Sequence, residues 1–384
     1  MIWDAGRGRA WAWVASWAVV VSAALGGCRS KGTPAEPKVA PEPVMMIPQP
    51  STGFQVRYGD EIIVAGRLYR IGTPVVTWMD VGGYDAYRVE RRFVPWEESH
   101  WGPTTRAIAE GRSDLSPSSP NRYNLRYQRT ATERYTPSEL EQIRGGGWSL
   151  ELLQKHVDQF VIHYDVCGVS RQCFRVLHDL RGLSVHFMLD IDGTIYQTLD
   201  LKERAWHAGK ANDRSIGIEI ANMGSYSLRE SIAPLMEWYK KDASGQTYIQ
   251  IPARLGGESA VRTRGVTFRP ARNDMVVGQI HGITQRMYDL TPQQYDALIK
   301  LTAALCDIFP QIQPDAPRDE NGQVIMTVLS DEQFQNFKGV LGHFHVTREK
   351  VDPGVAFQWE YVLESARQLL AARKARTTGT DVSP

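Results

Sequence analysis

The sequence predicts an α/β domain built on one central mixed β-sheet, which is flanked by helices and preceded by a small β-rich extension. Two observations support this fold class. From Trp148 onward, short apolar runs typical of buried strands alternate with stretches of helical periodicity. Two of these runs, residues 186–191 and 194–199, flank the dipeptide Asp192-Gly193, the strongest short signal for a β-hairpin.

The expected elements follow in order along the main domain, residues 148–376. Thr291-Pro292 marks the start of one helix. Between about residues 226 and 288 the sequence turns polar and irregular, which indicates an insertion on the domain. The expected strands are 160–164, 186–191, 194–199, 215–222 and 339–342, and the expected helices are about 171–180, 291–308 and 355–372.

Residues 57–147 form the expected N-terminal extension. Its first part contains short β-rich runs separated by glycines, which suggest a small sheet or hairpin layer. Residues 98–135 are rich in Ser, Thr, Pro and Arg without a sustained period, so we expect a loop that follows the surface. Residues 377–384 are expected to be a disordered tail.

Composition and charge narrow the class of protein. The chain has 44 Lys and Arg against 43 Asp and Glu, a formal charge of +1, so nucleic acid is not expected as a partner. Hydrophobic residues at 42% and charged residues at 23% are ordinary for a globular protein. The four cysteines show no CxxC pair, so any metal must be held by other residue types.

The first thirty residues predict export and lipidation. A positively biased start is followed by an uncharged run over residues 10–24, which is too short for a spanning helix and fits the apolar region of a signal peptide. The run ends in Leu25-Gly26-Gly27-Cys28, which resembles the lipobox of bacterial lipoproteins. We therefore expect a signal peptide over residues 1–27 and lipid on Cys28; a plain signal anchor is the alternative.

A proline-rich tether is expected over residues 28–56. Residues 29–51 contain six prolines among Lys, Glu, Ala and Ser, with almost nothing apolar to bury. Such a segment should be extended and reach up to about 70 Å at roughly 3.1 Å per residue. It would hold the domain away from the membrane.

Three side chains stand out as possible metal ligands. His163 and His343 each lie at the end of an expected strand, and Asp352 lies in a Lys-Val-Asp-Pro-Gly turn. Two imidazoles and a carboxylate leave a tetrahedral zinc ion one open position for water, as in catalytic sites. Attack on an amide also needs a proton acceptor and a cation for the oxyanion, and Glu219 and Lys350 are the candidates.

Seven segments in this order resemble the zinc N-acetylmuramoyl-L-alanine amidases of the type-2 family, which also contains phage lysozyme-type amidases and peptidoglycan recognition proteins. The resemblance covers about residues 148–358, less the insertion. The segments are VIHY (161–164), SVHF (184–187), DGTIYQ (192–197), RAWHAG (204–209), SIGIE (215–219), GH (342–343) and KVDPG (350–354).

The resemblance implies a zinc enzyme with the fold predicted above. It implies that His163, His343 and Asp352 bind zinc, that Glu219 deprotonates the water, and that Lys350 steadies the oxyanion. The bond cut would be the amide between N-acetylmuramic acid and L-alanine, in peptidoglycan or muropeptides. A peptidoglycan-binding protein without activity is the alternative, and an amidase for another N-acyl amino acid is a more distant one.

The other histidines need separate treatment. His345 could compete with His343 as the second ligand, but His343 follows Gly342 directly, as in the family. His186 is expected to be a core residue rather than a ligand. The histidines that carry no motif and receive no role are His100, His156, His178 and His281.

The resemblance also suggests substrate contacts. Trp206 and His207 lie in the stretch that lines the cleft in this family, and Arg214 is near enough in sequence to meet a stem-peptide carboxylate. The alternatives, that Trp206 packs in the interior and that Arg214 is a solvated loop residue, have about the same weight as the substrate contacts. Four arginines of the insertion could bind carboxylates of the stem peptide or of the wall polymer, although the preferred interpretation is that they form a solvated charged face. They are Arg262, Arg264, Arg269 and Arg272.

The cysteines of the main domain fall into two groups. Cys167 and Cys173 have a spacing that resembles the disulfide beside the first zinc ligand in peptidoglycan recognition proteins, so we expect a disulfide, with two free thiols as the alternative. Cys306, on an apolar helix face, is expected to be a buried free thiol.

The sequence therefore predicts a monomeric periplasmic lipoprotein, anchored to the cell envelope and most simply to the outer membrane. Its amidase domain would carry one Zn²⁺ and act on peptidoglycan or muropeptides. Its contact with the membrane would be made through the N-terminal lipid.

Overall fold

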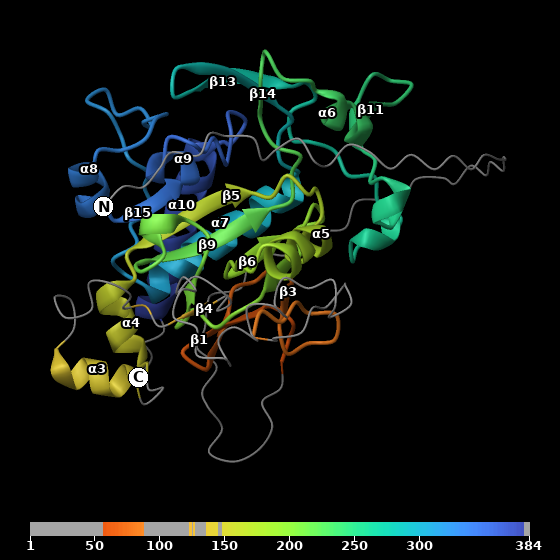
Figure 1. The fold of residues 1–384 in the computed structure, drawn as a ribbon. Coiled ribbons are helices and arrows are strands. Elements are labelled where there is room, and N and C mark those ends of the chain that lie inside the picture. The colour runs from red at the N-terminus through yellow and green to blue at the C-terminus, as the bar shows by residue number, and fades with distance from the viewer. Residues whose placement is uncertain (1–56, 88–122, 125, 127–135, 145–147, 380–384) are drawn as a thin grey trace, which may run out of the picture. The chain divides into compact units, whose positions relative to one another are not determined.

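The structure is a computed structural model that describes residues 57–87, 123–124, 126, 136–144 and 148–379 (Figure 1). The predicted signal peptide, the predicted lipidation site Cys28, the predicted tether up to residue 56 and most of the segment predicted as a loop, residues 98–135, lie outside the described residues. Among the residues that are described, no helix combines the length and the hydrophobicity that a membrane-spanning helix requires.

A six-stranded mixed sheet forms the centre of the domain and confirms the predicted fold class. All neighbouring strands are parallel except β6 and β7, which form the antiparallel hairpin expected around Asp192-Gly193. In sheet order the strands are β15 (Gly339–Gly342), β5 (Gln159–Tyr164), β9 (Ser215–Ile220), β6 (Phe187–Leu189), β7 (Ile195–Gln197) and β3 (Val75–Thr77).

Alternate residues of the central strands face different surroundings. Phe160 and Ile162 of β5 belong to the largest apolar cluster, together with the inner faces of α7 (Pro292–Ile308) and α10 (Trp359–Gly379). Val161, between them, belongs to a different cluster on the opposite face. Because side chains alternate along a strand, His163 also points to the face away from α7 and α10.

Local hydrogen bonds and turns determine where the two long helices begin. The Thr291 side chain accepts a hydrogen bond from the Gln294 N–H, and the Gln294 side chain accepts one from the Thr291 N–H, so α7 starts at the predicted position with a capping box. Helix α10 starts four residues later than predicted, because residues 354–357 form a turn in which the Phe357 N–H donates to the Gly354 carbonyl at 3.3 Å. It ends at Gly379, inside the segment expected to be a tail.

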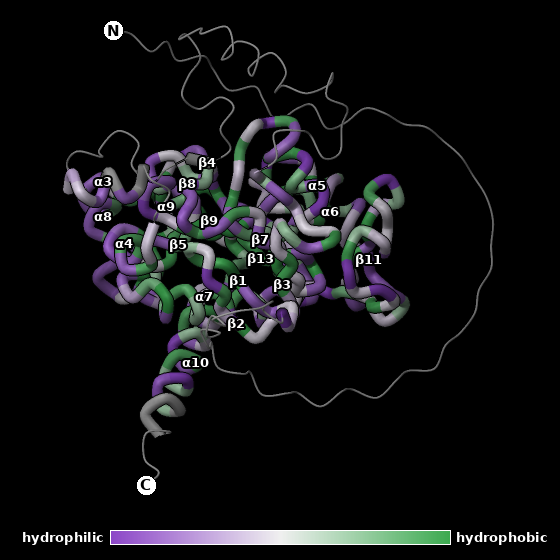
Figure 2. The backbone as a smooth tube through the Cα atoms, turned by 90° about the horizontal axis from the view of Figure 1, so that it is seen from below, coloured by the Kyte–Doolittle hydropathy of each residue, from purple (hydrophilic) through white to green (hydrophobic). Residues whose placement is uncertain are grey.

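The other elements surround this centre. In Figure 2 the apolar, green stretches gather around the central strands and α7, whereas α3 and α8 at the rim are largely hydrophilic. The remaining short elements are α3 (Pro137–Arg144), α4 (Leu150–His156), α5 (Ser170–Phe174) with a π-helix (Arg175–Leu180), β8 (Arg204–Ala205) paired with β4 (Tyr123–Asn124), a 3-10 helix (Gly209–Ala211), α8 (Asp331–Asn336) and α9 (His343–Val346).

The N-terminal extension shares the central sheet. Its first part forms the hairpin of β1 (Glu61–Val64) and β2 (Arg67–Arg70), and its next strand, β3, extends the central sheet beside β7. The buried Gln197 side chain of β7 accepts a hydrogen bond from the Ile63 N–H at 2.7 Å and donates one to the Ile63 carbonyl at 2.8 Å. The hairpin is thereby fixed to the main domain.

The insertion is ordered, contrary to the irregular segment that its polar sequence predicted. It contains a three-stranded antiparallel sheet and a separate hairpin, and its apolar cluster is built around Trp238. The strands are too short for a clear period. They are β10 (Tyr226–Ser227), β14 (Ile283–Met287) and β13 (Val276–Ile280) in the sheet, and β11 (Tyr239–Lys241) with β12 (Thr247–Ile249) in the hairpin, with α6 (Ala233–Trp238) and two 3-10 helices (Ala253–Leu255 and Gly257–Ala260).

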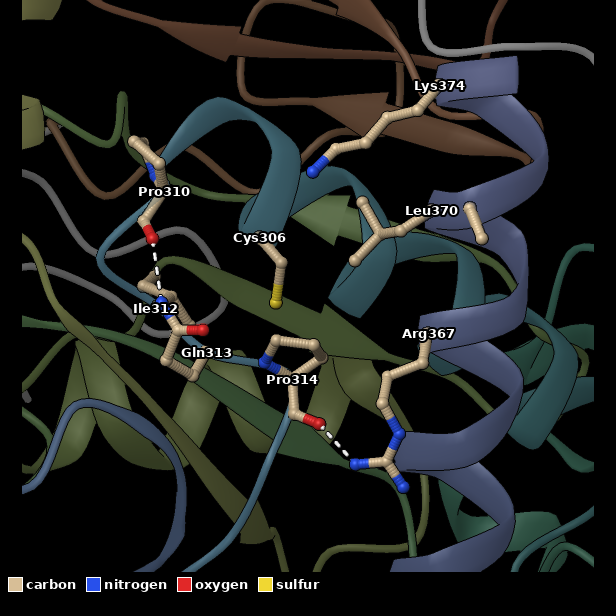
Figure 3. A pocket seen from close by; sticks show the side chains of 9 residues that line it. Cys306, Pro310, Ile312, Gln313, Pro314, Arg367, Leu370 and Lys374 are labelled. Atoms are coloured by element: carbon tan, nitrogen blue, oxygen red, sulfur yellow. Dashed lines mark hydrogen bonds between the residues drawn. The ribbon is translucent and has the colours of Figure 1, made fainter. Parts of the chain in front are cut away.

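A pocket of about 430 Å³ lies between the end of α7, the following loop and α10 (Figure 3). Cys306 lines it as a free thiol, as predicted, and burial raises the pKa of this thiol to about 12. The Arg367 guanidinium donates a hydrogen bond to the Pro314 carbonyl across the pocket wall. The pocket lies on the α7 and α10 side of the sheet, whereas His163 faces the other side.

Replacing Gln197 with alanine should destabilise the protein by about 1–3 kcal/mol, because it leaves the buried N–H and carbonyl of Ile63 without partners. Urea unfolding followed by circular dichroism measures the loss. Gln335→Ala, on the exposed surface of α8, is the matched control and should change stability by no more than about 0.5 kcal/mol. Equal stabilities of the two variants would contradict the role of Gln197.

Candidate metal centre

The carboxyl ends of three neighbouring parallel strands meet at one edge of the sheet. Gly342, the last residue of β15, pairs with Ile162, and the next residue of β5, His163, pairs with Glu219 of β9. His343 follows Gly342 directly. This register places His343, His163 and Glu219 side by side, with His163 and Glu219 on the same face of the sheet.

The third predicted ligand reaches this edge from a loop. Asp352 follows α9, and the Phe344 N–H donates a hydrogen bond to the Asp352 carbonyl at 3.2 Å, which ties the loop to the residue after His343. Asp352 Oδ2 lies 2.8 Å from His163 Nδ1 and 3.0 Å from His343 Nδ1, and the two imidazole nitrogens are 3.0 Å apart. All three side chains are buried.

The protonation states of His163 and Asp352 suit the binding of a cation. Burial and, to a smaller extent, the charge of His343 lower the pKa of His163 to about 4, so His163 is neutral at pH 7. Burial alone would raise the pKa of Asp352. However, the charge of His343 and the hydrogen bonds of both imidazoles outweigh burial and lower that pKa, so Asp352 is ionised. A neutral imidazole and a carboxylate are the forms that bind a metal.

The triangle of donor atoms is better explained by a metal ion than by hydrogen bonds. With Asp352 ionised, at least one of the three contacts pairs two donors or two acceptors, whichever imidazole nitrogens carry a proton. A cation accepts lone pairs from all three atoms at once. The separations are slightly shorter than the roughly 3.3 Å between ligand atoms of a tetrahedral zinc ion. Within the described part of the chain, this is the one such group of three His, Cys, Asp or Glu residues.

His207 contacts the second ring nitrogen of His163, Nε2, which does not belong to the donor group. His163 Nε2 lies 2.9 Å from His207 Nδ1, and His207 Nε2 lies 3.2 Å from Ser215 Oγ. If each Nε2 carries the proton, His163 donates to His207 and His207 donates to Ser215, which leaves His163 Nδ1 with a lone pair for the metal. Gly217 leaves the room for this ring, because a Cβ there would lie 2.5 Å from the His207 imidazole.

Glu219 is partly buried beside the donor atoms. Burial raises its pKa well above the usual value, and the nearby charges of Asp352 and Asp165 raise it further. The positive charge of Lys350 acts in the opposite direction. Glu219 therefore interacts electrostatically with Asp352, and Lys350 interacts with Glu219 and His163.

The two competing histidines have other partners. His345 Nδ1 accepts a hydrogen bond from the Gly342 N–H at 2.9 Å, and its Nε2 donates to the Ile325 carbonyl at 2.6 Å. The structure thus brings His343, and not His345, to the donor group. His186 lies in the core, as expected, where its Nδ1 accepts from the Gly217 N–H at 3.1 Å. Burial lowers the pKa of both His186 and His345 to about 3.

Two of the side chains that were predicted to contact the substrate, Trp206 and Arg214, lie in different surroundings. Trp206 is partly exposed, with the Arg204 guanidinium 4.5 Å from its ring centre. Arg214 is buried at the amino end of β9, where it forms two 2.6 Å hydrogen bonds with Asp158. Five residues of extended strand, about 16 Å, separate it from Glu219. The predicted contact between Arg214 and the substrate is therefore not supported.

The structure also shows the state of the two neighbouring cysteines and the partners of the arginines in the insertion. Cys167 and Cys173 are free thiols in the structure, so the predicted disulfide is absent, although the two side chains are close enough to form a hydrogen bond. In the insertion, Arg269 binds Asp242 and Arg272 binds Asp289, whereas the other two arginines are exposed: Arg262 and Arg264.

Sequence reasoning missed His281, which lies at the tip of the β13–β14 hairpin and contacts the Lys350 carbonyl. The signal was present, because His281-Gly282 separates two five-residue runs with strand-forming residues. A histidine at the first position of such a turn is uncommon. In addition, the surrounding sequence is polar, so the hairpin was not predicted.

Comparisons with known proteins agree with this geometry. A family model described as N-acetylmuramoyl-L-alanine amidase matches residues 153–355, more than half of the chain. No curated protein matches the chain at a significant level.

Several solved structures match more weakly. The N-acetylmuramyl-L-alanine amidase AmiD from E. coli, in complex with anhydro-N-acetylmuramic acid-L-Ala-D-gamma-Glu-L-Lys, is 19% identical over 55% of this chain and 57% of its own, with a TM-score of 0.31. A selenomethionine derivative of AmpD is 19% identical over 56% and 86%, with a TM-score of 0.26. The amidase LysC from Clostridium intestinale URNW is 17% identical over 56% and 88%, with a TM-score of 0.29.

The buried histidines make stability depend on pH in a defined direction. The pKa of His345 is about 3 in the folded protein, against about 6.5 when unfolded, so the unfolded state takes up the proton first as the pH falls. From pH 7 to pH 5 the free energy of unfolding should lose about 2 kcal/mol through this residue. His345→Asn keeps an acceptor for the Gly342 N–H but does not titrate. Urea unfolding at both pH values should therefore show a smaller loss in the variant, and equal losses would contradict the assignment.

Proposed function

Because the chain belongs to the N-acetylmuramoyl-L-alanine amidase family, we propose that it hydrolyses the amide between N-acetylmuramic acid and L-alanine, in peptidoglycan or its muropeptide fragments, with one Zn²⁺ per chain. The observation that carries the proposal is the convergence of His163, His343 and Asp352 beside Glu219. Two imidazoles and a carboxylate are a common ligand set of zinc hydrolases. When bound, zinc polarises the carbonyl and lowers the pKa of water.

Glu219 is the proposed proton carrier. Burial and the charge of Asp352 favour the protonated form of Glu219, and a cation bound by the three donor atoms would favour its carboxylate form. Glu219 can therefore take a proton from the attacking water and return it to the alanine nitrogen as the C–N bond breaks. The products are the free muramic acid carboxylate and a peptide that begins with L-alanine.

Lys350 is the proposed stabiliser of negative charge. Its positive charge acts on both Glu219 and His163, which supports this role. A cation fixed near the carbonyl oxygen stabilises the charge that develops during attack. The carboxyl group of Glu219 beside His163 and the charge of Lys350 acting on both residues support catalysis over peptidoglycan binding alone.

We also propose that the protein is a periplasmic lipoprotein with lipid on Cys28. The support is the sequence of residues 1–28, with its apolar run and lipobox-like ending, and the proline-rich residues that follow it. The amidase domain, at the end of a long tether, would then bind its substrate in the periplasm. The proposed partners are the peptidoglycan or muropeptide substrate and the membrane, which the protein would contact through its N-terminal lipid.

The activity can be tested with purified sacculi and muropeptides. Zinc-loaded protein should release stem peptides that begin with L-alanine, detected by mass spectrometry. Glu219→Gln should keep its zinc and lose at least about 100-fold in rate, because it cannot carry the proton. Asp352→Asn should lose zinc. If zinc-loaded wild-type protein binds sacculi without releasing peptides, the alternative of a binding protein is correct.

Lipidation can be tested separately by labelling cells with radioactive palmitate. The full chain should incorporate the label and sediment with membranes. Cys28→Ser should do neither, whereas Cys306→Ser should behave like the wild type, because that thiol is buried in the domain. Incorporation of label into Cys28→Ser would disprove the proposed site.

A further inference from the structure

The β13–β14 hairpin of the insertion packs on the segment that carries Lys350 and Asp352 (Figure 1). We propose that His281, at the tip of this hairpin, is a positioning residue that fixes the Lys350–Asp352 segment and thereby the third metal ligand. This proposal rests on the proposed function, since it assigns the insertion a role in assembling that site. It makes the hairpin part of the catalytic domain.

Three contacts connect the hairpin to residues 350–355. His281 Nε2 donates a hydrogen bond to the Lys350 carbonyl at 2.8 Å. Further along, Gly354 lies so close to Met287 that a Cβ at this glycine would be 2.2 Å from the Met287 Sδ. On β13, a Cβ at Gly278 would lie 3.1 Å from the Val355 Cβ. The hairpin therefore holds both ends of the segment, with Asp352 between them.

The tip itself is held rigidly. The His281 N–H donates to the Met326 carbonyl at 2.9 Å, and its Nδ1 accepts a hydrogen bond from Thr327 Oγ1 at 3.2 Å. The bond to Thr327 leaves the proton on Nε2, which is the nitrogen that faces Lys350. His281 and Gly282 have φ values of +54° and +75°, as in the two-residue turns that hairpins favour.

The hydrogen bond from His281 Nε2 to the Lys350 carbonyl is short, at 2.8 Å. The backbone hydrogen bond from the Lys350 N–H to the Thr347 carbonyl is longer, at 3.4 Å. The His281 ring also lies edge-on to Phe344, with 6.3 Å between ring centres, and Phe344 directly follows the ligand His343. One imidazole therefore contacts the loop of one ligand and the neighbour of another.

Two substitutions separate this role from the shape of the turn. In His281→Gln the longer amide can reach the position of Nε2 and keep the bond to Lys350. In His281→Asn the shorter amide reaches only the position of Nδ1 and loses it. Asparagine tolerates a positive φ better than glutamine does. Turn strain alone would therefore make the Gln variant the worse of the two, whereas the proposal predicts that the Asn variant is worse.

The test uses the full chain and three measurements: zinc affinity by competition with a chelator, hydrogen exchange of residues 347–352, and kcat and KM on muropeptides. For His281→Asn we expect about tenfold weaker zinc binding, faster exchange and a lower kcat, with KM changed by less than about twofold. His281→Gln should stay close to the wild type.

Two results would overturn the proposal: wild-type zinc affinity and exchange in His281→Asn, or a larger loss in His281→Gln than in His281→Asn. If the wild type binds zinc and releases no peptide, the proposed function fails. Zinc affinity and exchange would still decide the role of His281.

Discussion

The site depends on the parallel pairing of β15, β5 and β9 in one register. Parallel strands end at the same edge of a sheet, and the pairing of Gly342 with Ile162 and of His163 with Glu219 brings a ligand or acid to each strand end. A shift by one residue would turn His163 toward α7 and α10 and separate it from Glu219. The apolar packing of Phe160 and Ile162 on those helices excludes that shift, so the core fixes the chemistry of the edge.

The sequence predicted what local patterns and ordered motifs determine. The apolar run before His163, the Asp-Gly hairpin and the Thr-Pro helix start each encode their structure within a few residues, and the structure has all three. The three donor residues followed from the resemblance of short motifs, and the structure brings them within 3.0 Å of one another. Their separation in the sequence, from His163 to Asp352, is bridged only by the sheet.

What the sequence could not determine are contacts between segments distant in the chain. Arg214 was expected to face the substrate, but its partner Asp158 precedes the adjacent strand, and only the register shows that both lie at the edge opposite to the metal centre. The bond between Gln197 and Ile63, which joins the extension to the main domain, likewise crosses 134 residues. Motif spacing carries no information about such pairs.

The insertion illustrates how a site can depend on a segment that its motifs do not include. The Asp352 carboxylate must remain ionised and buried, which costs free energy that only fixed donors and a cation offset. Holding it there requires a rigid backbone, and the backbone on both sides of Asp352 is held by residues of the hairpin, with His281 on Lys350 and Met287 on Gly354. The six-stranded sheet supplies two ligands from rigid strand ends, and the third, on a loop, takes its rigidity from the insertion.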